Sequence, residues 1–230
     1  MPVARRKGRR RPGKREPRRA ITVFAEGRVT EVEYLKAIRG ELHLPKELVD
    51  IRCSNCNDPL KLVKTAITER SKAGGGMDVT EHWWVLADTE GCNGSPHLLE
   101  AVKLAQAKGI WLGLSEPSVE FWLLLHLSDA SGSFSNAKSV IRRLQRAGLA
   151  GYDEKNKHPD MAKLREGLPL AMERARHLRE QNTKHGLRAP FTDLDLLVDD
   201  INCQASDDRA LFSKRQPTWE DLAMNLLQLE

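Results

Sequence analysis

The chain has 230 residues, of which 40% are hydrophobic and 30% are charged. This length predicts one large domain, or one domain with an appended subdomain, whose core needs neither disulfides nor metal. No apolar run approaches the ~18 residues of a membrane-spanning helix, and no apolar segment follows the basic N-terminus as in a secretory signal. Four irregularly spaced cysteines favour a reducing cytoplasm over a secreted disulfide framework.

Positive charge is concentrated in residues 1–19, which hold ten Lys and Arg and one acid, so that residues 20–230 carry a net charge of −4. The segment is rich in Arg, Gly and Pro and lacks apolar periodicity, which predicts a disordered arm. We expect the arm to bind nucleic-acid phosphates without reading sequence, the alternatives being a solubilising tail or an extension from a misplaced start codon. The cations concerned are Arg5, Arg6, Lys7, Arg9, Arg10, Arg11, Lys14, Arg15, Arg18 and Arg19.

Short apolar runs alternate with helical periodicity from residue 20 to residue 128. Strands are predicted at Ile21–Ala25, Leu48–Arg52, Trp83–Ala87 and Ile110–Leu114. Helices are predicted at about 32–40, at Pro59–Arg70, at about 95–108 and, fully buried, at Val119–Leu127. This order predicts an α/β fold in which a mainly parallel sheet of about four strands is flanked by helices.

Strand signals stop after about Asp129. The later helices are predicted at Ala137–Arg146, Met161–Gln181, Leu194–Ile201 and Trp219–Leu229. We therefore expect residues 129–230 to form a helical C-terminal region packed on the sheet.

Three of the four predicted strands end in acidic residues. Glu26 follows the first strand, and Asp88 and Glu90 follow the third. Ligands bind beyond the carboxyl ends of the strands in an open α/β sheet, and carboxylates that converge there repel one another until a divalent cation relieves the repulsion. These three acids therefore predict a site for Mg²⁺ or Mn²⁺, and Gly27, which has no Cβ, suits a tight turn beside it.

Further acids lie near the same strand ends. Glu31 follows Glu26 by about one helical turn, and Glu116 and Glu120 follow the fourth strand. Taken singly, these last three also fit the general preference for acids at helix N-termini, so their role stays open at this point.

Three segments around these acids share a recognisable pattern: Phe24-Ala25-Glu26-Gly27 with Thr30-Glu31, Ala87-Asp88-Thr89-Glu90, and the stretch from Ser115 to His126. They resemble the RloB family, which is related to Toprim-domain nucleases and is found beside restriction and phage-defence genes. Tyr152 with Lys155, and Pro190-Phe191-Thr192, extend the likeness, which covers about residues 20–202.

The resemblance implies a Toprim-like fold in residues 20–128 that binds Mg²⁺ for phosphodiester hydrolysis. It implies that Glu26 is a metal ligand or general acid/base supported by Glu31, that Asp88 and Glu90 are paired metal ligands, and that Glu120 is a further catalytic and metal-binding acid. Glu90 departs from the family pattern, which usually has Asp there, and Glu116 stands where relatives tend to have Asn.

Several residues are expected to support this site. Ser115, Glu116 and His126 belong to the most specific segment of the resemblance, although an apolar helix also makes His126 a candidate core residue. Lys155 is the candidate catalytic cation, in a loop with Lys157 and His158 that either neutralises phosphate charge or is simply solvated.

Other patterns are interpreted as structural. Cys53 and Cys56 have the CxxC spacing of half a zinc site or a redox pair, but Cys92, His97 and Cys203 are scattered, so partly buried thiols are expected. The residues Trp83, Trp84, Trp111 and Trp122 are predicted to be core. The acids Asp193, Asp195, Asp199 and Asp200 are predicted to lie on a solvated helix face.

Together these patterns and the family resemblance predict a cytoplasmic Mg²⁺-dependent nuclease that cleaves DNA or RNA, tRNA included, in prokaryotic defence against phage or foreign nucleic acid. The alternative is a non-catalytic nucleic-acid-binding or sensor subunit that acts with other defence proteins. A third possibility is nucleotidyl transfer, because Toprim domains also serve polymerising enzymes.

Overall fold

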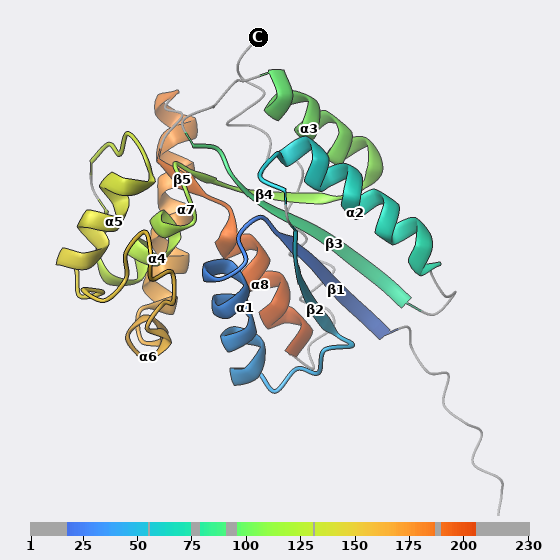
Figure 1. Ribbon diagram of the computed structural model, residues 1–230, viewed down its shortest axis with the longest axis horizontal. Helices are drawn as coiled ribbons and strands as arrows, with labels where there is room; N and C mark the ends of the chain where they lie inside the picture. Colours follow the sequence, from blue (N-terminus) through green and yellow to red (C-terminus); the bar gives the residue numbers. More distant parts are fainter. Residues whose placement is uncertain are drawn as a thin grey trace, which may run out of the picture.

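The computed structural model describes residues 18–54, 56–74, 79–90, 96–130, 132–186 and 190–205. It contains a five-stranded sheet in the order β2-β1-β3-β4-β5 (Figure 1). Strands β1 to β4 are mutually parallel, and β5 pairs with β4 in the antiparallel sense. The bounds are β1 Arg18–Ala25, β2 Val49–Cys53, β3 Val79–Asp88, β4 Trp111–Glu116 and β5 Phe191–Thr192. The predicted α/β fold is thus confirmed.

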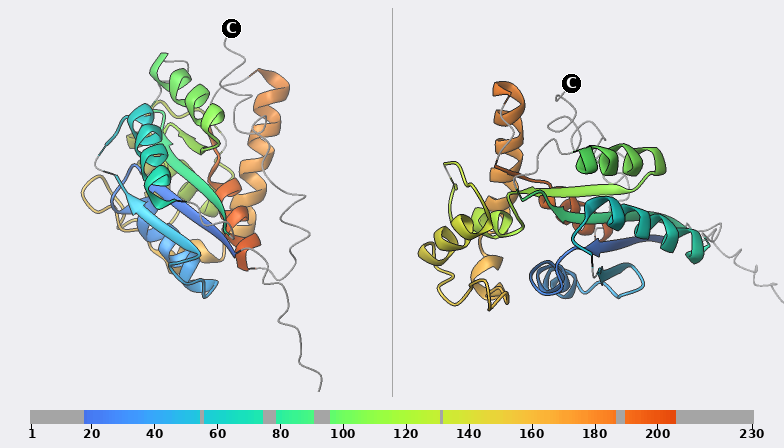
Figure 2. Two further views of the ribbon diagram at one scale, coloured as in Figure 1. Left: turned by 90° about the vertical axis from the view of Figure 1, so that its right-hand side faces the viewer. Right: turned by 45° about the horizontal axis from the view of Figure 1, so that its top comes forward.

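Helices cover both faces of the sheet. Helices α2 and α3 pack on one face, whereas α1 and α8 lie on the other (Figures 1 and 2). The bounds are α1 Thr30–Glu41, α2 Pro59–Ala73, α3 Pro96–Lys108, α4 Glu120–Leu127, α5 Ala137–Arg146, α6 Met161–Arg165, α7 Leu168–His185 and α8 Leu194–Ala205. In the described part of the chain, no helix combines the length and the apolarity needed to cross a bilayer.

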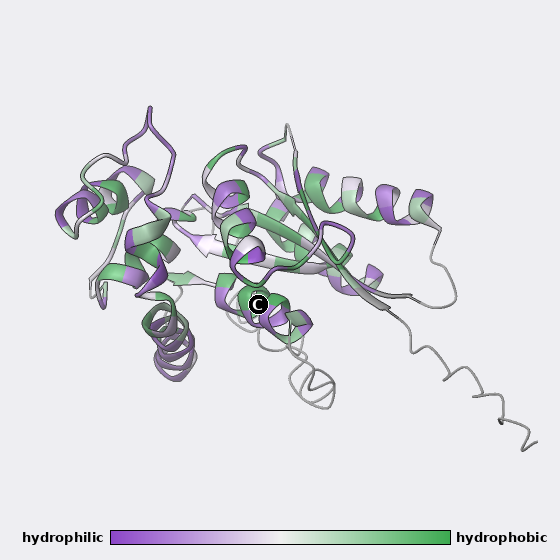
Figure 3. Ribbon diagram, turned by 90° about the horizontal axis from the view of Figure 1, so that it is seen from below, coloured by the Kyte–Doolittle hydropathy of each residue, from purple (hydrophilic) through white to green (hydrophobic). Residues whose placement is uncertain are grey.

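The strands are apolar on both sides because each side faces a layer of helices. Alternate residues of β3 enter different cores: Trp84 packs with α1 and α8, whereas Trp83 packs with α2 and α3. Figure 3 shows hydrophobic residues along the strands and mixed colours along the surrounding helices. The prediction of core tryptophans is correct for these two and for Trp122, and Trp111 is half-buried against the core.

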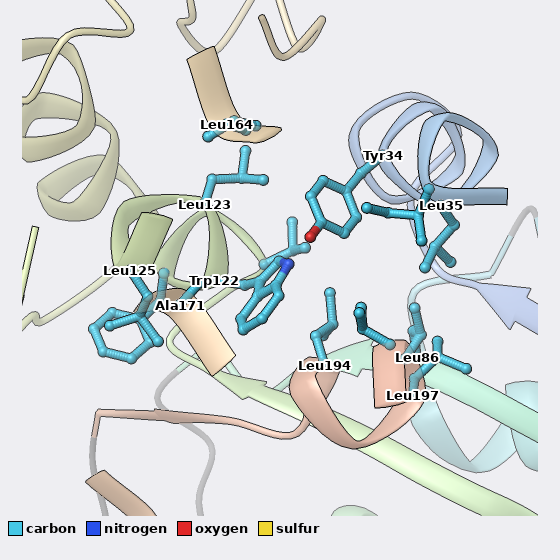
Figure 4. Close-up of a cluster of buried hydrophobic side chains, with 14 of the residues drawn as sticks. Tyr34, Leu35, Leu86, Trp122, Leu123, Leu125, Leu164, Ala171, Leu194 and Leu197 are labelled. Carbon is cyan, nitrogen blue, oxygen red and sulfur yellow. The ribbon is translucent and has the colours of Figure 1, made fainter. Parts of the chain in front are cut away.

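Helices α4, α5, α6 and α7 gather at one end of the sheet (Figure 1). The apolar α4 lies at their centre, where Trp122 meets Tyr34 of α1 edge to face, near Leu164 of α6 (Figure 4). The single helix predicted over Met161–Gln181 is two helices, α6 and α7. A Cβ on Gly167, between them, would overlap the backbone carbonyl of His126, so this close packing of chain on chain requires glycine there.

Two further details of the sequence prediction differ from the structure. Strand β1 begins at Arg18, so Arg18 and Arg19 belong to the sheet instead of the arm, because their backbone pairs with β3. The two-residue strand β5 was not predicted, since so short a segment shows no periodicity. Residues 1–17, which hold the other arm cations, and the predicted helix Trp219–Leu229 lie outside the described residues.

The prediction that the four acids from Asp193 to Asp200 lie on a solvated face is wrong for three of them, because Asp193, Asp195 and Asp200 are buried. Arg179 of α7 forms a two-pronged ion pair with Asp195, with N···O distances of 2.5 and 2.6 Å. Asp193 accepts the backbone N–H of Leu114 at 3.2 Å. Asp200 contacts His82 Nδ1 at 3.0 Å and accepts the indole N–H of Trp84 at 2.8 Å, both from β3.

Candidate active site

The carboxyl ends of β1 and β3 form a topological switch point. The helix that follows β1 lies on one face of the sheet, and the helix that follows β3 lies on the other, which opens a crevice between the two strand ends. Glu26 comes directly after β1, and Asp88 is the last residue of β3. The Glu26 Oε2 atom accepts the backbone N–H of Asp88 at 3.0 Å, although the two residues are 62 positions apart. The structure thus brings together the first two acids predicted to meet.

A pocket of about 240 Å³ opens at this switch point. Four carboxylates line it, from three separate segments of the chain: Glu26, Glu31, Asp88 and Glu120. The remaining lining residues are Gly27, Arg28, Val29, Thr30, Asn57, Val119 and Lys157. Asn57 and Arg28 were not predicted, although Asn57 lies shortly after β2, at the same edge of the sheet.

Glu26 and Asp88 carry more negative charge than their surroundings compensate. Burial, together with the charges of Glu31 and Glu90, raises the pKa of Glu26 to about 7 against the hydrogen bond from the Asp88 backbone. Burial also raises the pKa of Asp88 well above its usual range, assisted by the charges of Glu31, Glu120 and Glu26. This pocket therefore attracts protons or other cations.

Gly27 allows Glu31 to fold back over the start of α1. The Glu31 Oε1 atom accepts the backbone N–H of Gly27 at 2.9 Å, and a Cβ on Gly27 would overlap the Glu31 carboxylate. This contact satisfies an N–H just ahead of a helix whose N-cap, Val29, has no capping side chain. Burial raises the pKa of Glu31 as well. The side chain that requires glycine at position 27 is therefore that of Glu31.

Glu120 is engaged by three donors of the protein itself. Its Oε1 atom accepts the Tyr152 hydroxyl at 2.9 Å and pairs closely with the Lys157 ammonium, while its Oε2 atom accepts the Ser118 hydroxyl at 2.6 Å. Burial would raise the pKa of Glu120, but the charge and hydrogen bond of Lys157, with the Ser118 hydrogen bond, lower it below its usual range. Glu120 is thus an ionised residue that holds Lys157 at the pocket.

Lys157, and not Lys155, is the lysine that the 152–158 loop brings to the pocket. The Thr30 hydroxyl lies within hydrogen-bond distance of both the Tyr152 hydroxyl, at 2.7 Å, and the Lys157 carbonyl, at 3.0 Å. Lys155 is exposed, its backbone N–H donates to Asp153 at 2.7 Å, and it does not line the pocket. The Tyr/Lys pattern therefore pointed to this loop, and the lysine of the loop that lines the pocket is Lys157, two residues after the predicted Lys155.

Three other predicted site residues, Glu90, Ser115 and Glu116, lie outside the pocket lining. Glu90 is exposed, in a turn with φ of 47°, although its charge reaches Glu26. Ser115 contacts the hydroxyl of Thr192 at 2.9 Å, and Glu116 accepts the hydroxyl of Thr89, both in the buried junction of β4 with its neighbours. These contacts order the end of β4 without presenting Ser115 or Glu116 to the pocket.

His126 is a core residue. Its ring contacts the Tyr34 hydroxyl at 3.1 Å and the Leu164 carbonyl at 2.7 Å, and burial lowers its pKa to about 4. The imidazole is therefore neutral at physiological pH and joins α1, α4 and α6. The interpretation of His126 as a satisfied core histidine agrees with these contacts.

The donor set of the pocket fits a hard divalent cation. No three His, Cys, Asp or Glu residues in the described ranges already converge as a metal site. Mg²⁺, however, is commonly held by one or two carboxylates, with water and substrate phosphates completing its shell. Glu26 uses only Oε2 and Asp88 only Oδ1 in hydrogen bonds to described residues, so each has a second oxygen for such an ion.

The cysteines form a separate region. Cys53 is exposed and Cys56 is half-buried, and both are free thiols, as is Cys203. His97 faces Asp58 at 3.6 Å, away from a sulfur ligand set, and Cys92 lies outside the described residues. Nothing in the described part of the chain assembles the zinc site that the CxxC spacing allowed.

Comparison with known proteins agrees with this architecture. The family model of RloB-like protein matches residues 21–201, a stretch that begins within β1 and reaches into α8. No curated protein and no solved structure matches the chain significantly. The matched stretch is well over half of the chain, and the protein belongs to the RloB-like protein family.

Proposed function

We propose that this protein is a cytoplasmic nuclease that uses Mg²⁺ or Mn²⁺ to hydrolyse phosphodiester bonds of DNA or RNA, tRNA included. The observation that carries the proposal is the meeting of Glu26 and Asp88 at the switch point, in a pocket where burial and the charges of neighbouring acids raise the pKa of both carboxyls. Strongly shifted carboxyls that converge in a cleft mark a functional site.

The roles of the pocket residues follow from their contacts. Glu26 and Asp88 would hold the metal ion through their second oxygens, and the bound ion would supply charge neutralisation and a more acidic water. In the other role open to Glu26, Asp88 would hold the ion and Glu26 would take a proton from the attacking water. Lys157, fixed by Glu120, places positive charge where a phosphate would enter.

Two predicted metal ligands take other roles in this proposal. Glu120 has donors on both of its oxygens and serves to position Lys157. Glu90 lies outside the pocket lining and adds negative charge beside Glu26. A role in defence against phage or foreign nucleic acid, with other defence proteins as partners, rests on the family resemblance alone.

The test is a cleavage assay with the purified full chain on DNA, RNA and tRNA, in Mg²⁺, in Mn²⁺ and in EDTA. We expect metal-dependent cleavage that falls at least about 100-fold in Glu26→Gln and in Asp88→Asn, the range in which loss of a general base or metal ligand acts. Glu100→Gln, which alters an exposed acid of α3, is the matched control and should cleave as the wild type does.

Two other results would point to the alternatives. Binding of nucleic acid without cleavage in either metal would indicate a non-catalytic or sensor subunit, and would contradict the nuclease. Incorporation of labelled nucleotide into a strand would instead indicate nucleotidyl transfer.

A further inference from the structure

Charge is divided unequally between the sheet and the helices at its end. Residues 20–128 hold 11 Lys and Arg against 15 Asp and Glu, whereas residues 129–186, which include α5, α6 and α7, hold 12 against 7. The first segment is net negative and the second net positive. The acidic pocket repels phosphates. Electrostatic attraction of a polyanionic substrate therefore depends mainly on positive charge outside the pocket.

Helix α5 of this basic region has four cations and no acid. Its apolar side packs on α4 through Val140, Ile141 and Leu144. Its other side is exposed, and it presents Arg142, Arg143 and Arg146 within little more than one turn. We call these three arginines the α5 arginine face.

The α5 arginine face is not neutralised by its surroundings. None of its three side chains makes a hydrogen bond or an ion pair with any residue that the structure describes. By contrast, Arg165 pairs with Glu41, and Arg174 donates to the carbonyl of Leu125. Guanidinium groups without acid partners keep their planar set of N–H donors for an external anion, and that geometry matches phosphate.

Helix α5 is also connected to the pocket through side chains. Gln145 donates its amide N–H to the carbonyl of Tyr152 at 2.9 Å, and the Tyr152 hydroxyl donates to Glu120 of the pocket. Figure 1 shows α5 beside α4 and α6 at the end of the sheet. These two contacts hold α5 in a fixed position relative to the pocket.

We propose that the α5 arginine face binds the sugar-phosphate backbone of nucleic acid. The substrate class rests on the proposed function, but binding itself requires no hydrolysis. Because phosphate contacts from arginine carry no sequence information, the face adds affinity and salt dependence and leaves specificity to other contacts.

The experiment compares two full-length triple variants that lose the same charge. Arg142→Gln, Arg143→Gln and Arg146→Gln are combined in one protein, and Lys61→Gln, Lys64→Gln and Lys72→Gln, all exposed on α2, are combined in the other. Binding to fluorescein-labelled single-stranded and duplex oligonucleotides is measured by anisotropy in EDTA over a range of salt concentrations. Circular dichroism and urea denaturation verify that both variants are folded.

We expect the α5 variant to bind at least about tenfold more weakly at physiological salt. The slope of log Kobs against log salt should become shallower by about two to three, because each lost phosphate contact removes about 0.7–0.9. The α2 variant should keep the wild-type slope. Residues 1–17 are present in both proteins, so their contribution cancels in the comparison.

The possible failures can be told apart. Equal effects of the two triple variants, or no effect of the α5 variant, would overturn the binding face whether or not the protein cleaves. Wild-type binding that depends on the α5 arginines, with no cleavage in any metal, would support the face and contradict the nuclease. If the wild-type chain bound no nucleic acid, both proposals would be wrong.

Discussion

Two groups of acidic side chains lie close to the sheet of this protein, and their charges are compensated in opposite ways. In the first group, Glu26 and Asp88 meet at the switch point and repel one another, with burial raising both pKa values. In the second group, Asp195 and Asp200 of α8 are buried. Asp195 pairs with the guanidinium of Arg179, and Asp200 contacts His82 and Trp84 of β3.

The difference separates structural acids from candidate functional ones. A buried carboxylate that has a matched cation or N–H donors stabilises the fold only as long as the partner remains, because its loss leaves an uncompensated charge. Carboxylates that share a pocket with too few cations cost stability in the free protein and provide a site for an ion. Removing the partner cation from the paired group should therefore lower the free energy of unfolding, whereas removing a carboxylate from the pocket group should raise it.

The largest effect is expected in the paired group. Replacing Arg179 with Met leaves Asp195 buried without its cation, and it should lower the free energy of unfolding by about 3–5 kcal/mol. Urea denaturation measures this, with Arg176→Met, an exposed arginine on the same helix, as the control. Similar stability of the two variants would show that the ion pair is not what compensates Asp195.

The pocket group should respond in the opposite direction. Glu26→Gln keeps an oxygen to accept the Asp88 N–H but removes the repelled charge, so it should raise the free energy of unfolding at pH 8 in EDTA. The expected gain is about 1–2 kcal/mol, after allowance for the solvent screening of a partly exposed group. The same variant should bind Mn²⁺ more weakly by calorimetry. Destabilisation instead of stabilisation would remove the contrast between the groups.

The gain from Glu26→Gln should also depend on pH. Because the pKa of Glu26 is about 7 in the folded protein and 4.5 is its ordinary value, the folded state binds the proton more tightly. The stabilisation from the protonated Glu26 side chain is therefore fully present below about pH 4.5 and is lost as pH rises to about 7. Urea titrations of both proteins should agree near pH 4.5 and diverge progressively up to pH 8. A difference that is constant with pH would show that Glu26 does not titrate in this range.

The smallest effect is expected at Lys157, one of the cationic residues that line the pocket. Replacing Lys157 with Met removes a positive charge that opposes a divalent ion, so Mn²⁺ affinity should rise by about 3–10-fold, equivalent to about 1 kcal/mol. Lys155→Met, in the same loop but away from Glu120, should leave the affinity unchanged. Isothermal titration calorimetry distinguishes the two, and weaker binding in Lys157→Met would mean that this lysine organises the site instead of opposing the ion.

Much of the fold was predictable because it is written in local patterns. Four strands and most helices were located within a few residues, since apolar runs and capping residues such as Asp58 act over short distances. The rule that parallel strands present their carboxyl ends at one edge then placed Glu26 and Asp88 together. The break at Gly167 and the strand β5 escaped prediction, because each exists only through contact with a distant segment.

By itself, the sequence determined the alternation of strands and helices and the presence of acids at the strand ends, because periodicity and chain order are local properties. Only the tertiary structure decided which acids are compensated: Asp195 meets Arg179 from another helix, and Glu120 meets Lys157, 37 residues along the chain. Charge compensation depends on which side chains face each other across the folded chain. The spacing of these residues in the sequence does not tell which side chains will face each other.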